Sequence, residues 1–256
     1  MIRDVGGSYR RALAETVHHY SGWRPEPAAI DNLKSEGRWN NDWEASLELL
    51  RRRDHTPLPG FAELVEVFSG FYFGGDPEAD PATWRGFIDD EPLLVDRDFF
   101  AALDAAGIVW GFVSGAEPPS ARFVLEQRLG LKAPALIAMG DAPDKPDPAG
   151  LLRLAAELLS RHDVDSFGPQ APPIAYLGDT VADVQTVLNA RTQVPQQRFM
   201  SLAVAPPHLH SVPAAASRLA YENNLRQAGA DAVVPHTTGV IEPLQGLLSA
   251  PWPQGS

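Results

Sequence analysis

From about residue 93 onward, the chain alternates between short apolar runs and stretches with helical periodicity. The apolar runs are rich in residues that favour β-strands, and each one precedes a helical pattern. The expected strands are 108–115, 135–140, 174–178, 199–204 and 232–234, and the expected helices are 98–106, 119–129, 148–161, 182–190 and 214–227. Strands that are apolar on both faces belong in parallel sheets with helices on both sides. The alternation therefore predicts an α/β fold with a doubly wound parallel sheet.

The first 90 residues show helical periodicity and almost no strand signal. Ser8 is placed to cap a first helix, and Asp80 followed by proline marks another helix start. Helices are expected over residues 8–20, 25–37, 42–53 and 58–69, and four of the six tryptophans fall in this part (Trp23, Trp39, Trp43 and Trp84). We therefore expect a small helical domain over residues 8–92, an α/β domain over residues 93–250 and a loose tail over residues 251–256.

The composition narrows the class of partner. Cysteine is absent, which excludes disulfides, zinc–thiolate sites and thiol nucleophiles. The chain has 33 acidic and 21 basic residues, and the net charge of −12 opposes binding to nucleic acid or to an anionic membrane surface. No apolar run approaches the ~20 residues that cross a bilayer, and Arg3 and Asp4 interrupt the segment where an export signal would be apolar. We expect a small-molecule partner and a cytoplasmic location, with no nucleic acid and no membrane.

Polar residues gather where the expected strands end. Ser114 and Gly115 follow one strand, Asp179 follows another with Asp183 four residues later, and Lys145 lies between them, just before a helix. Because ligands bind beyond the carboxyl ends of strands in an open parallel sheet, we expect these residues to converge. A hydroxyl with backbone amides can hold phosphate oxygens, a lysine can neutralise them, and carboxylates suit Mg²⁺. The set predicts metal-assisted phosphoryl transfer.

Each of these residues also has a plain structural interpretation. Ser114 could belong to an ordinary turn after a strand, and Lys145 could be a solvated loop lysine. Asp179 could cap the next helix, with Asp183 a surface acid in its first turn. Asp147 is expected to cap a helix rather than to take part in catalysis. The order of the motifs along the chain favours the functional interpretation of the others.

Three motifs in this order resemble those of the haloacid dehalogenase superfamily of phosphohydrolases, in the subgroup whose helical cap follows the first strand. They are Val113-Ser114-Gly115, Lys145-Pro146-Asp147-Pro148 (the most specific single match) and Gly178-Asp179-Thr180-Val181-Ala182-Asp183. The resemblance spans nearly the whole chain and implies a Rossmann-like core with an inserted cap. It implies that Ser114 and Gly115 bind the phosphoryl group and that Lys145 holds this group and the nucleophile together. It also implies that Asp179 ligates Mg²⁺ and that Asp183 does so directly or through water. The dehalogenases of the superfamily work without a metal, so the paired acids favour a phosphatase.

The family's first motif, a strand ending in D-x-D-G-[TV], does not occur in the sequence. Its two aspartates are the nucleophile and the general acid/base, and Asp4 has no preceding strand that could place it in either role. Residues 1–7 resemble the segment that directly follows this motif, as a remnant of the first core segment. In the family fold the missing strand is central, and its loss leaves unpaired strand edges inside the core. We therefore expect the protein to start roughly 10–20 residues upstream, enough for one strand and the motif, with a GTG valine codon written as Met1.

The resemblance implies a Mg²⁺-dependent phosphatase that acts on a small phosphorylated metabolite through an aspartyl-phosphate intermediate. Two alternatives remain open. If Met1 is the true start, the chain is a catalytically inactive protein that binds phosphate esters and metal. In the second alternative the same core catalyses phosphonate hydrolysis or a mutase reaction instead of phosphate-ester hydrolysis. Phosphonate hydrolysis in the family needs a cap lysine that forms a Schiff base with the substrate. Lys34 is the only lysine in the helical part.

The segment 34–43 joins two expected helices and mixes basic, amide and aromatic side chains. In capped members of the family the corresponding loop faces the active site. Lys34, Arg38 and Asn40 are therefore candidate substrate contacts. In the alternative interpretation Asp42 is an N-cap, the tryptophans belong to the core and Arg38 is a surface residue.

Overall fold

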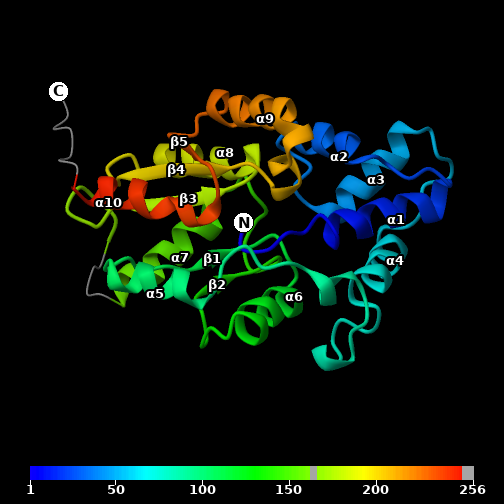
Figure 1. The fold of residues 1–256 in the computed structure, drawn as a ribbon, viewed down its shortest axis with the longest axis horizontal. Helices are drawn as coiled ribbons and strands as arrows, with labels where there is room; N and C mark the ends of the chain where they lie inside the picture. The colour runs from blue at the N-terminus through cyan, green and yellow to red at the C-terminus, as the bar shows by residue number, and fades with distance from the viewer. Residues whose placement is uncertain (162–165, 250–256) are drawn as a thin grey trace.

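The computed structural model describes residues 1–161 and 166–249, so the expected tail at 251–256 lies outside the described residues. Four helices gather at one end of the molecule, and the strands with their covering helices form the other end (Figure 1). None of the helices in the described ranges is both long and apolar enough to cross a membrane.

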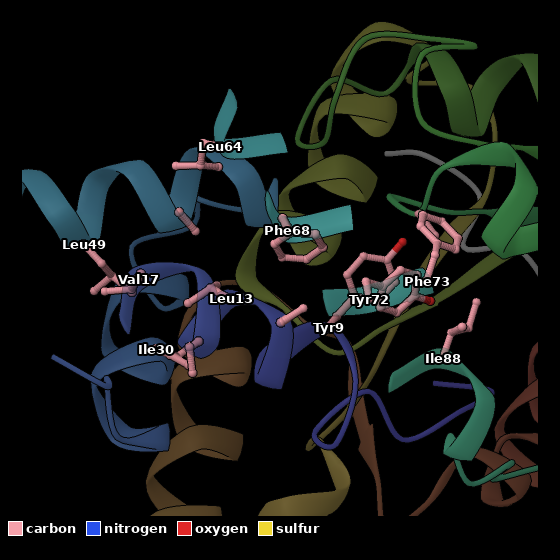
Figure 2. Packing of buried hydrophobic residues seen from close by; sticks show 14 of the residues in the cluster. Tyr9, Leu13, Val17, Ile30, Leu49, Leu64, Phe68, Tyr72, Phe73 and Ile88 are labelled. Carbon is pink, nitrogen blue, oxygen red and sulfur yellow. The ribbon is translucent and has the colours of Figure 1, made fainter. Parts of the chain in front are cut away.

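The helical end is built from α1 (Tyr9–Ser21), α2 (Pro27–Lys34), α3 (Asp42–Arg52) and α4 (Phe61–Phe73), followed by the short 3₁₀ helices η1 (Pro81–Thr83) and η2 (Phe87–Asp90). Their apolar faces share one core, in which Leu13 of α1 and Leu64 and Phe68 of α4 are fully buried (Figure 2). The ring of Tyr9 stacks on that of Tyr72, with 4.0 Å between centroids. This aromatic packing continues into the α/β end through Trp84, which lies against Phe123.

Two expected helix caps differ from those in the structure. The Ser8 side chain does not cap α1, because its hydroxyl donates to the buried carboxylate of Glu91 instead. Helix α3 begins at Asp42, but its cap is Asn41, whose side chain accepts hydrogen bonds from the backbone N–H groups of Trp43 and Glu44. Glu91 forms a buried ion pair with Arg3, so Ser8 contributes to a buried polar cluster rather than to the helix end.

The strands form two parallel sheets. Strand β1 (Phe112–Val113) pairs with β2 (Leu136–Ile137), and β4 (Phe199–Val204) lies between β3 (Ile174–Gly178) and β5 (Ala232–Val234). The three strands of the larger sheet match their predicted ranges residue for residue. The predicted ranges 108–115 and 135–140 are wrong in length, because only two residues of each form a paired strand.

The helices after residue 93 pack on the two sheets and on one another. They are α5 (Arg97–Ala105), α6 (Pro118–Arg122) with the π-helical η3 (Phe123–Arg128), α7 (Ala149–Ser160), α8 (Val181–Gln193), η4 (Pro207–His210), η5 (Val212–Ala214), α9 (Ala215–Gln227), η6 (Thr237–Val240) and α10 (Ile241–Ser249). Along β3, Ile174 and Tyr176 pack in the cluster of α7 and α8, whereas Ala175 and Leu177 pack in the cluster of η6 and α10. This alternation confirms the predicted α/β class with a parallel sheet covered on both sides. Helix α10 was not predicted.

The two sheets are separated by a cavity of about 700 Å³, which is lined by β1 on one side and by β3 on the other. Among the described strands, β1 pairs only with β2 and β3 only with β4. The N-terminal residues lie along a different segment: Arg3 forms an antiparallel bridge with Leu93, and the backbone N–H of Leu94 donates to the carbonyl of Ile2 at 2.9 Å. The facing edges of β1 and β3 thus border a space that no described strand fills.

Candidate active site

Lys145 and Asp183 form a buried ion pair at the carboxyl end of the parallel strands. Lys145 Nζ lies 2.6 Å from Asp183 Oδ1, and the two side chains are 14% and 4% exposed. Burial by itself lowers the pKa of Lys145, but the Asp183 carboxylate and the Tyr176 hydroxyl raise that pKa above its ordinary range. For Asp183, burial favours the neutral acid, yet Lys145 and Thr180 hold the pKa below its ordinary value. Both groups are therefore charged at neutral pH.

The second carboxylate oxygen of Asp183 organises the turn between β3 and α8. Asp183 Oδ2 accepts hydrogen bonds from the backbone N–H groups of Asp179 (3.1 Å) and Thr180 (3.0 Å) and from the Thr180 hydroxyl (2.7 Å). Thr180 in turn accepts from the Asp183 N–H, which completes a capping box. A Cβ on Gly178 would lie 2.0 Å from Asp183 Cβ, so this close approach requires glycine. The steric contact with Asp183 thus explains why the predicted motif has glycine at position 178.

Asp179 lines the cavity. In the described part of the chain no group donates a hydrogen bond to its carboxylate, whereas the backbone carbonyl of Asp179 accepts from the Tyr221 hydroxyl at 2.8 Å. No group of three His, Asp or Glu side chains is placed to hold a metal within the described residues. Mg²⁺ commonly takes only one or two carboxylates and completes its shell with phosphate oxygens and water. Asp179 fits that pattern as a ligand, whereas both oxygens of Asp183 already accept hydrogen bonds from Lys145, Tyr176 and the turn at Thr180.

Ser114 and Gly115 begin the loop that follows β1. The N–H of Ser114 donates to the Ile137 carbonyl at 2.8 Å, which extends the β1–β2 ladder by one bond. The Ser114 hydroxyl accepts from the N–H of Ala116 at 3.0 Å, so the loop folds over this side chain. Both Ser114 and Gly115 line the cavity that also reaches Lys145 and Asp179. The structure thus brings together the predicted residues of all three motifs.

Two of the three candidate residues in segment 34–43 reach this cavity. Lys34 and Asn40 line it, and a Cβ on Gly115 would lie 3.3 Å from Asn40 Nδ2. Lys34 Nζ donates to the Asn40 carbonyl at 2.9 Å and lies 2.8 Å from Asp42 Oδ1. Arg38 is not brought to the cavity: its side chain is 72% exposed and its guanidinium lies over the ring of Trp39.

Sequence reasoning missed three residues that surround the site. The Tyr176 hydroxyl donates to Asp183 Oδ1 at 3.2 Å and lies 3.5 Å from the Val113 carbonyl, so it reaches from β3 toward β1. Arg10 of α1 lines the cavity, and Tyr221 of α9 holds the Asp179 carbonyl. Tyr176 could have been found from the sequence, because it lies two residues before Gly178 and residues two apart in a strand share one face. Arg10 and Tyr221 are far from every motif along the chain.

Comparison with known proteins agrees with this geometry. Residues 76–191 match the family model of the haloacid dehalogenase-like hydrolases. No curated protein sequence matches the chain. A phosphonoacetaldehyde hydrolase-like protein from Oleispira antarctica has a similar structure, with a TM-score of 0.66 at 15% identity, covering 96% of this chain and 88% of that one.

Two further solved structures have the same fold. An HAD hydrolase of family IA, variant 3, from Entamoeba histolytica has a TM-score of 0.58 at 15% identity, covering 97% of this chain and 95% of its own. A predicted phosphoglycolate phosphatase from Haemophilus somnus has a TM-score of 0.54 at 12% identity, covering 92% and 90%. At these identities the likeness concerns the fold, whereas the family model concerns the sequence itself. Residues 76–191 are therefore similar to the haloacid dehalogenase-like hydrolases, and the three motifs meet at one cavity.

Proposed function

We propose that this protein is a Mg²⁺-dependent phosphatase that acts on a small phosphorylated metabolite. The observation that carries the proposal is the convergence of Ser114, Lys145, Asp179 and Asp183 on one cavity. Within the family the chemistry is hydrolysis, and this donor set suits a phosphate ester because it combines a hydroxyl, a cation and hard carboxylate oxygens. Mg²⁺, when held by Asp179 and Asp183, would neutralise charge on the phosphoryl oxygens.

The residues of the chain take distinct roles in this proposal. Ser114 and the backbone N–H groups of its loop hold an oxygen of the transferring phosphoryl group. Lys145 neutralises the same group, and its bond to Asp183 fixes the ammonium in the cavity wall. An aspartate carboxylate attacks phosphorus in line, and the P–O bond to the ester's alcohol breaks, so that the alcohol leaves with a proton. Water then hydrolyses the aspartyl-phosphate, which releases inorganic phosphate and restores the carboxylate. We place the attacking aspartate upstream of Met1, on a strand that occupies the space between β1 and β3.

The structure of the cavity supports this placement of the nucleophile. Its walls include Phe112 and Val113 of β1 and the stretch 174–177 of β3, so a strand between them would meet two parallel edges. Asp4 does not offer a carboxylate of its own, because Oδ1 accepts from the N–H of Gly6 and the residue is not among those that line the cavity. A strand in this space would end beside Ser114 and Lys145.

We further propose that residues 8–92 act as a cap over a core of residues 93–250, with residues 1–7 belonging to that core. Lys34 and Asn40 then approach the substrate from the cap, across from Ser114. Closure of such a cap excludes water from the reacting group and selects the substrate. The exposed Arg38 takes no part in this scheme.

The test is release of inorganic phosphate from simple phosphate esters, measured with Mg²⁺ and with a chelator. It uses the 256-residue chain and a form extended upstream by its own reading frame. We expect turnover by the extended form, lost with the chelator and reduced at least about 100-fold by Lys145→Met or Asp179→Asn. Ester binding without hydrolysis by the 256-residue chain, with no turnover by the extended form, would favour the inactive binding protein. Full activity of either variant would contradict the assigned roles.

Phosphonate hydrolysis is a second candidate, favoured by the position of Lys34. The chain has three lysines, and two of them, Lys34 and Lys145, line the same cavity. A Schiff base needs a neutral amine, however, and Lys34 is held in an ion pair with Asp42. Incubation with phosphonoacetaldehyde and borohydride decides between the two: covalent labelling of Lys34 supports phosphonate chemistry, and no labelling supports a phosphatase.

A further inference from the structure

Arg10 is a cation of the cavity wall that the phosphatase scheme does not use. It lies in the first turn of α1, its side chain is 16% exposed, and it lines the cavity that contains Lys145 and Asp179. Arg10 Nη1 donates to Asp31 Oδ1 at 2.6 Å, and among the described residues the side chain has no other acceptor. A guanidinium carries five N–H donors in a fixed plane, so most of them remain available to a ligand.

The Arg10 guanidinium is held in place by a contact between the two ends of the molecule. Asp31 of α2 uses Oδ1 for Arg10 and Oδ2 for His208 Nε2, which lies 2.9 Å away in η4. Burial raises the pKa of Asp31, but His208 and Arg10 more than offset this and hold the pKa below its ordinary value. The carboxylate therefore stays ionised and fixes the plane of the guanidinium.

Arg10 shares its cavity with the loop that carries Asp179. Arg10, Asp179, Lys145 and Ser114 all line this cavity, so one ligand can contact Arg10 and the predicted phosphate site. The Tyr221 hydroxyl donates to the Asp179 carbonyl at 2.8 Å and holds this loop against α9.

The other three cationic side chains that line the cavity in the described part of the chain are already matched with carboxylates, and Arg3 pairs with Glu91. Lys145 pairs with Asp183, and Lys34 pairs with Asp42 and with a carbonyl. Arg10 differs because one carboxylate oxygen occupies only one of its donors. A planar guanidinium binds a carboxylate through two parallel hydrogen bonds, a geometry that a lysine cannot offer.

We propose that Arg10 binds a carboxylate on the substrate, so that the substrates are small phosphate monoesters that also carry a carboxylate. This rests on the proposed function, because Ser114, Lys145 and Asp179 must hold the phosphate at the other end. Asp31 is then a positioning residue, which acts on the substrate through Arg10. His208 extends this support from the α/β end of the molecule.

The test compares two ligands that differ only at the proposed contact. Phosphoglycolate carries a carboxylate where 2-hydroxyethyl phosphate carries a hydroxymethyl group. Equilibrium binding of each to the extended chain is measured by calorimetry with Mg²⁺, in a variant whose nucleophile is replaced by asparagine. With Arg10 in place, we expect the dissociation constant for phosphoglycolate to be about tenfold lower, or more, than that for 2-hydroxyethyl phosphate. A charge-assisted bidentate contact implies a difference of this size.

Arg10→Gln should abolish this preference and leave the affinity for 2-hydroxyethyl phosphate unchanged. Arg10→Lys should restore only part of it, because the charge returns without the planar fork. Arg11→Gln is the matched control: Arg11 is the next residue of α1, is exposed, and stacks on Phe87 at 4.0 Å, so this variant should keep the full preference. Thermal unfolding of each variant verifies that it is folded.

Three results would overturn the proposal. If Arg10→Gln keeps the preference, the carboxylate is bound elsewhere. If the unsubstituted site binds both esters equally, Arg10 is not a specificity residue, while the phosphate site and the proposed function stand. If neither ester binds, the phosphate site itself fails, and both proposals fall together.

Discussion

At the scale of single residues, the site depends on charges that are buried in matched pairs. Lys145 and Asp183 are both largely inaccessible, and each offsets the burial of the other. Asp183 also accepts three hydrogen bonds from the turn at Asp179 and Thr180, so its ionised form has donors on both oxygens. The pair therefore supports the turn after β3 and also holds the Lys145 ammonium in the cavity wall.

Replacing Lys145 with methionine should destabilise the fold as well as stop turnover. The substitution leaves Asp183 buried without its cation, and breaking a buried pair in this way costs about 3 kcal/mol. The measurement is the free energy of unfolding in urea, with Lys132→Met as a control because Lys132 is exposed. The control should change stability by less than about 0.5 kcal/mol. Equal stability of both variants would show that the ion pair contributes nothing.

The lowered pKa of Asp31 predicts that the stability of the protein depends on pH. The folded pKa of Asp31 lies below its ordinary value, so its contribution is present above the unfolded pKa of about 3.9 and is lost as the pH falls through the folded pKa. Asp31→Asn should cost roughly 1 kcal/mol at pH 6, and this difference from the unsubstituted protein should shrink below about pH 4. Urea unfolding of both proteins from pH 3 to pH 7 measures it. A difference that stays constant to pH 3 would mean that Asp31 titrates normally.

How far single residues could be predicted depended on their distance from a motif. Ser114, Lys145, Asp179 and Asp183 follow strands or precede helices that are visible in the sequence, so their convergence follows from the parallel sheet. Arg10 contacts Asp31, which in turn contacts His208, a residue 177 positions further along the chain. No local pattern encodes such a contact. Arg38 had the right chemistry and lies in the right segment, but it points to solvent.

At the scale of elements, the turn between β3 and α8 is the most tightly specified part of the site. Gly178→Ala should disrupt it, since the new Cβ would lie 2.0 Å from the Asp183 side chain. We expect a loss of about 2 kcal/mol or more, because no small shift of Asp183 preserves its capping box. Gly70→Ala is the matched control: Gly70 lies within α4 with no atom near the added Cβ. It should stabilise the protein by about 0.5–1 kcal/mol.

These two opposite shifts are measured as changes in the free energy of unfolding. If both alanine variants changed the free energy of unfolding by the same amount, the close approach between Gly178 and Asp183 would not limit the residue at position 178. Binding of inorganic phosphate provides a second readout, because Gly178→Ala should also weaken the site. Gly70→Ala should leave phosphate binding unchanged.

The elements differ in how well their ranges could be predicted. Strands β3, β4 and β5 are continuous apolar runs with paired neighbours, so pattern and structure coincide. Around β1 the pattern extends over 108–115, but a strand also needs a partner along its length, and only Phe112 and Val113 have one. Helix α4 runs to Phe73 rather than to residue 69, because it ends at Gly74, whose φ of 68° provides a left-handed C-cap.

At the scale of the whole molecule, the cavity between the two sheets is the feature that needs an explanation. Its volume of about 700 Å³ is several times the ~150 Å³ of an engineered apolar cavity that stays dry and binds small ligands. Apolar groups such as Leu103, Leu154 and Leu177 line much of it. Protein interiors are close-packed, so a space of this size calls for an occupant. The parallel edges of β1 and β3 on its two sides favour an extended segment.

Adding a strand in this space should therefore stabilise the protein and complete its site. We expect a chain extended upstream by an apolar strand and D-x-D-G to unfold at a temperature at least 5 °C higher than the 256-residue chain, since about 1 kcal/mol shifts the midpoint by roughly 2–4 °C at this size. The extended chain should also bind less of a hydrophobic dye, because the strand covers the apolar walls. A matched extension of equal length with serine at the apolar positions controls for chain length. If both extensions gave the same midpoint and the same dye binding, the space would not be a strand site, and the nucleophile would have to come from elsewhere.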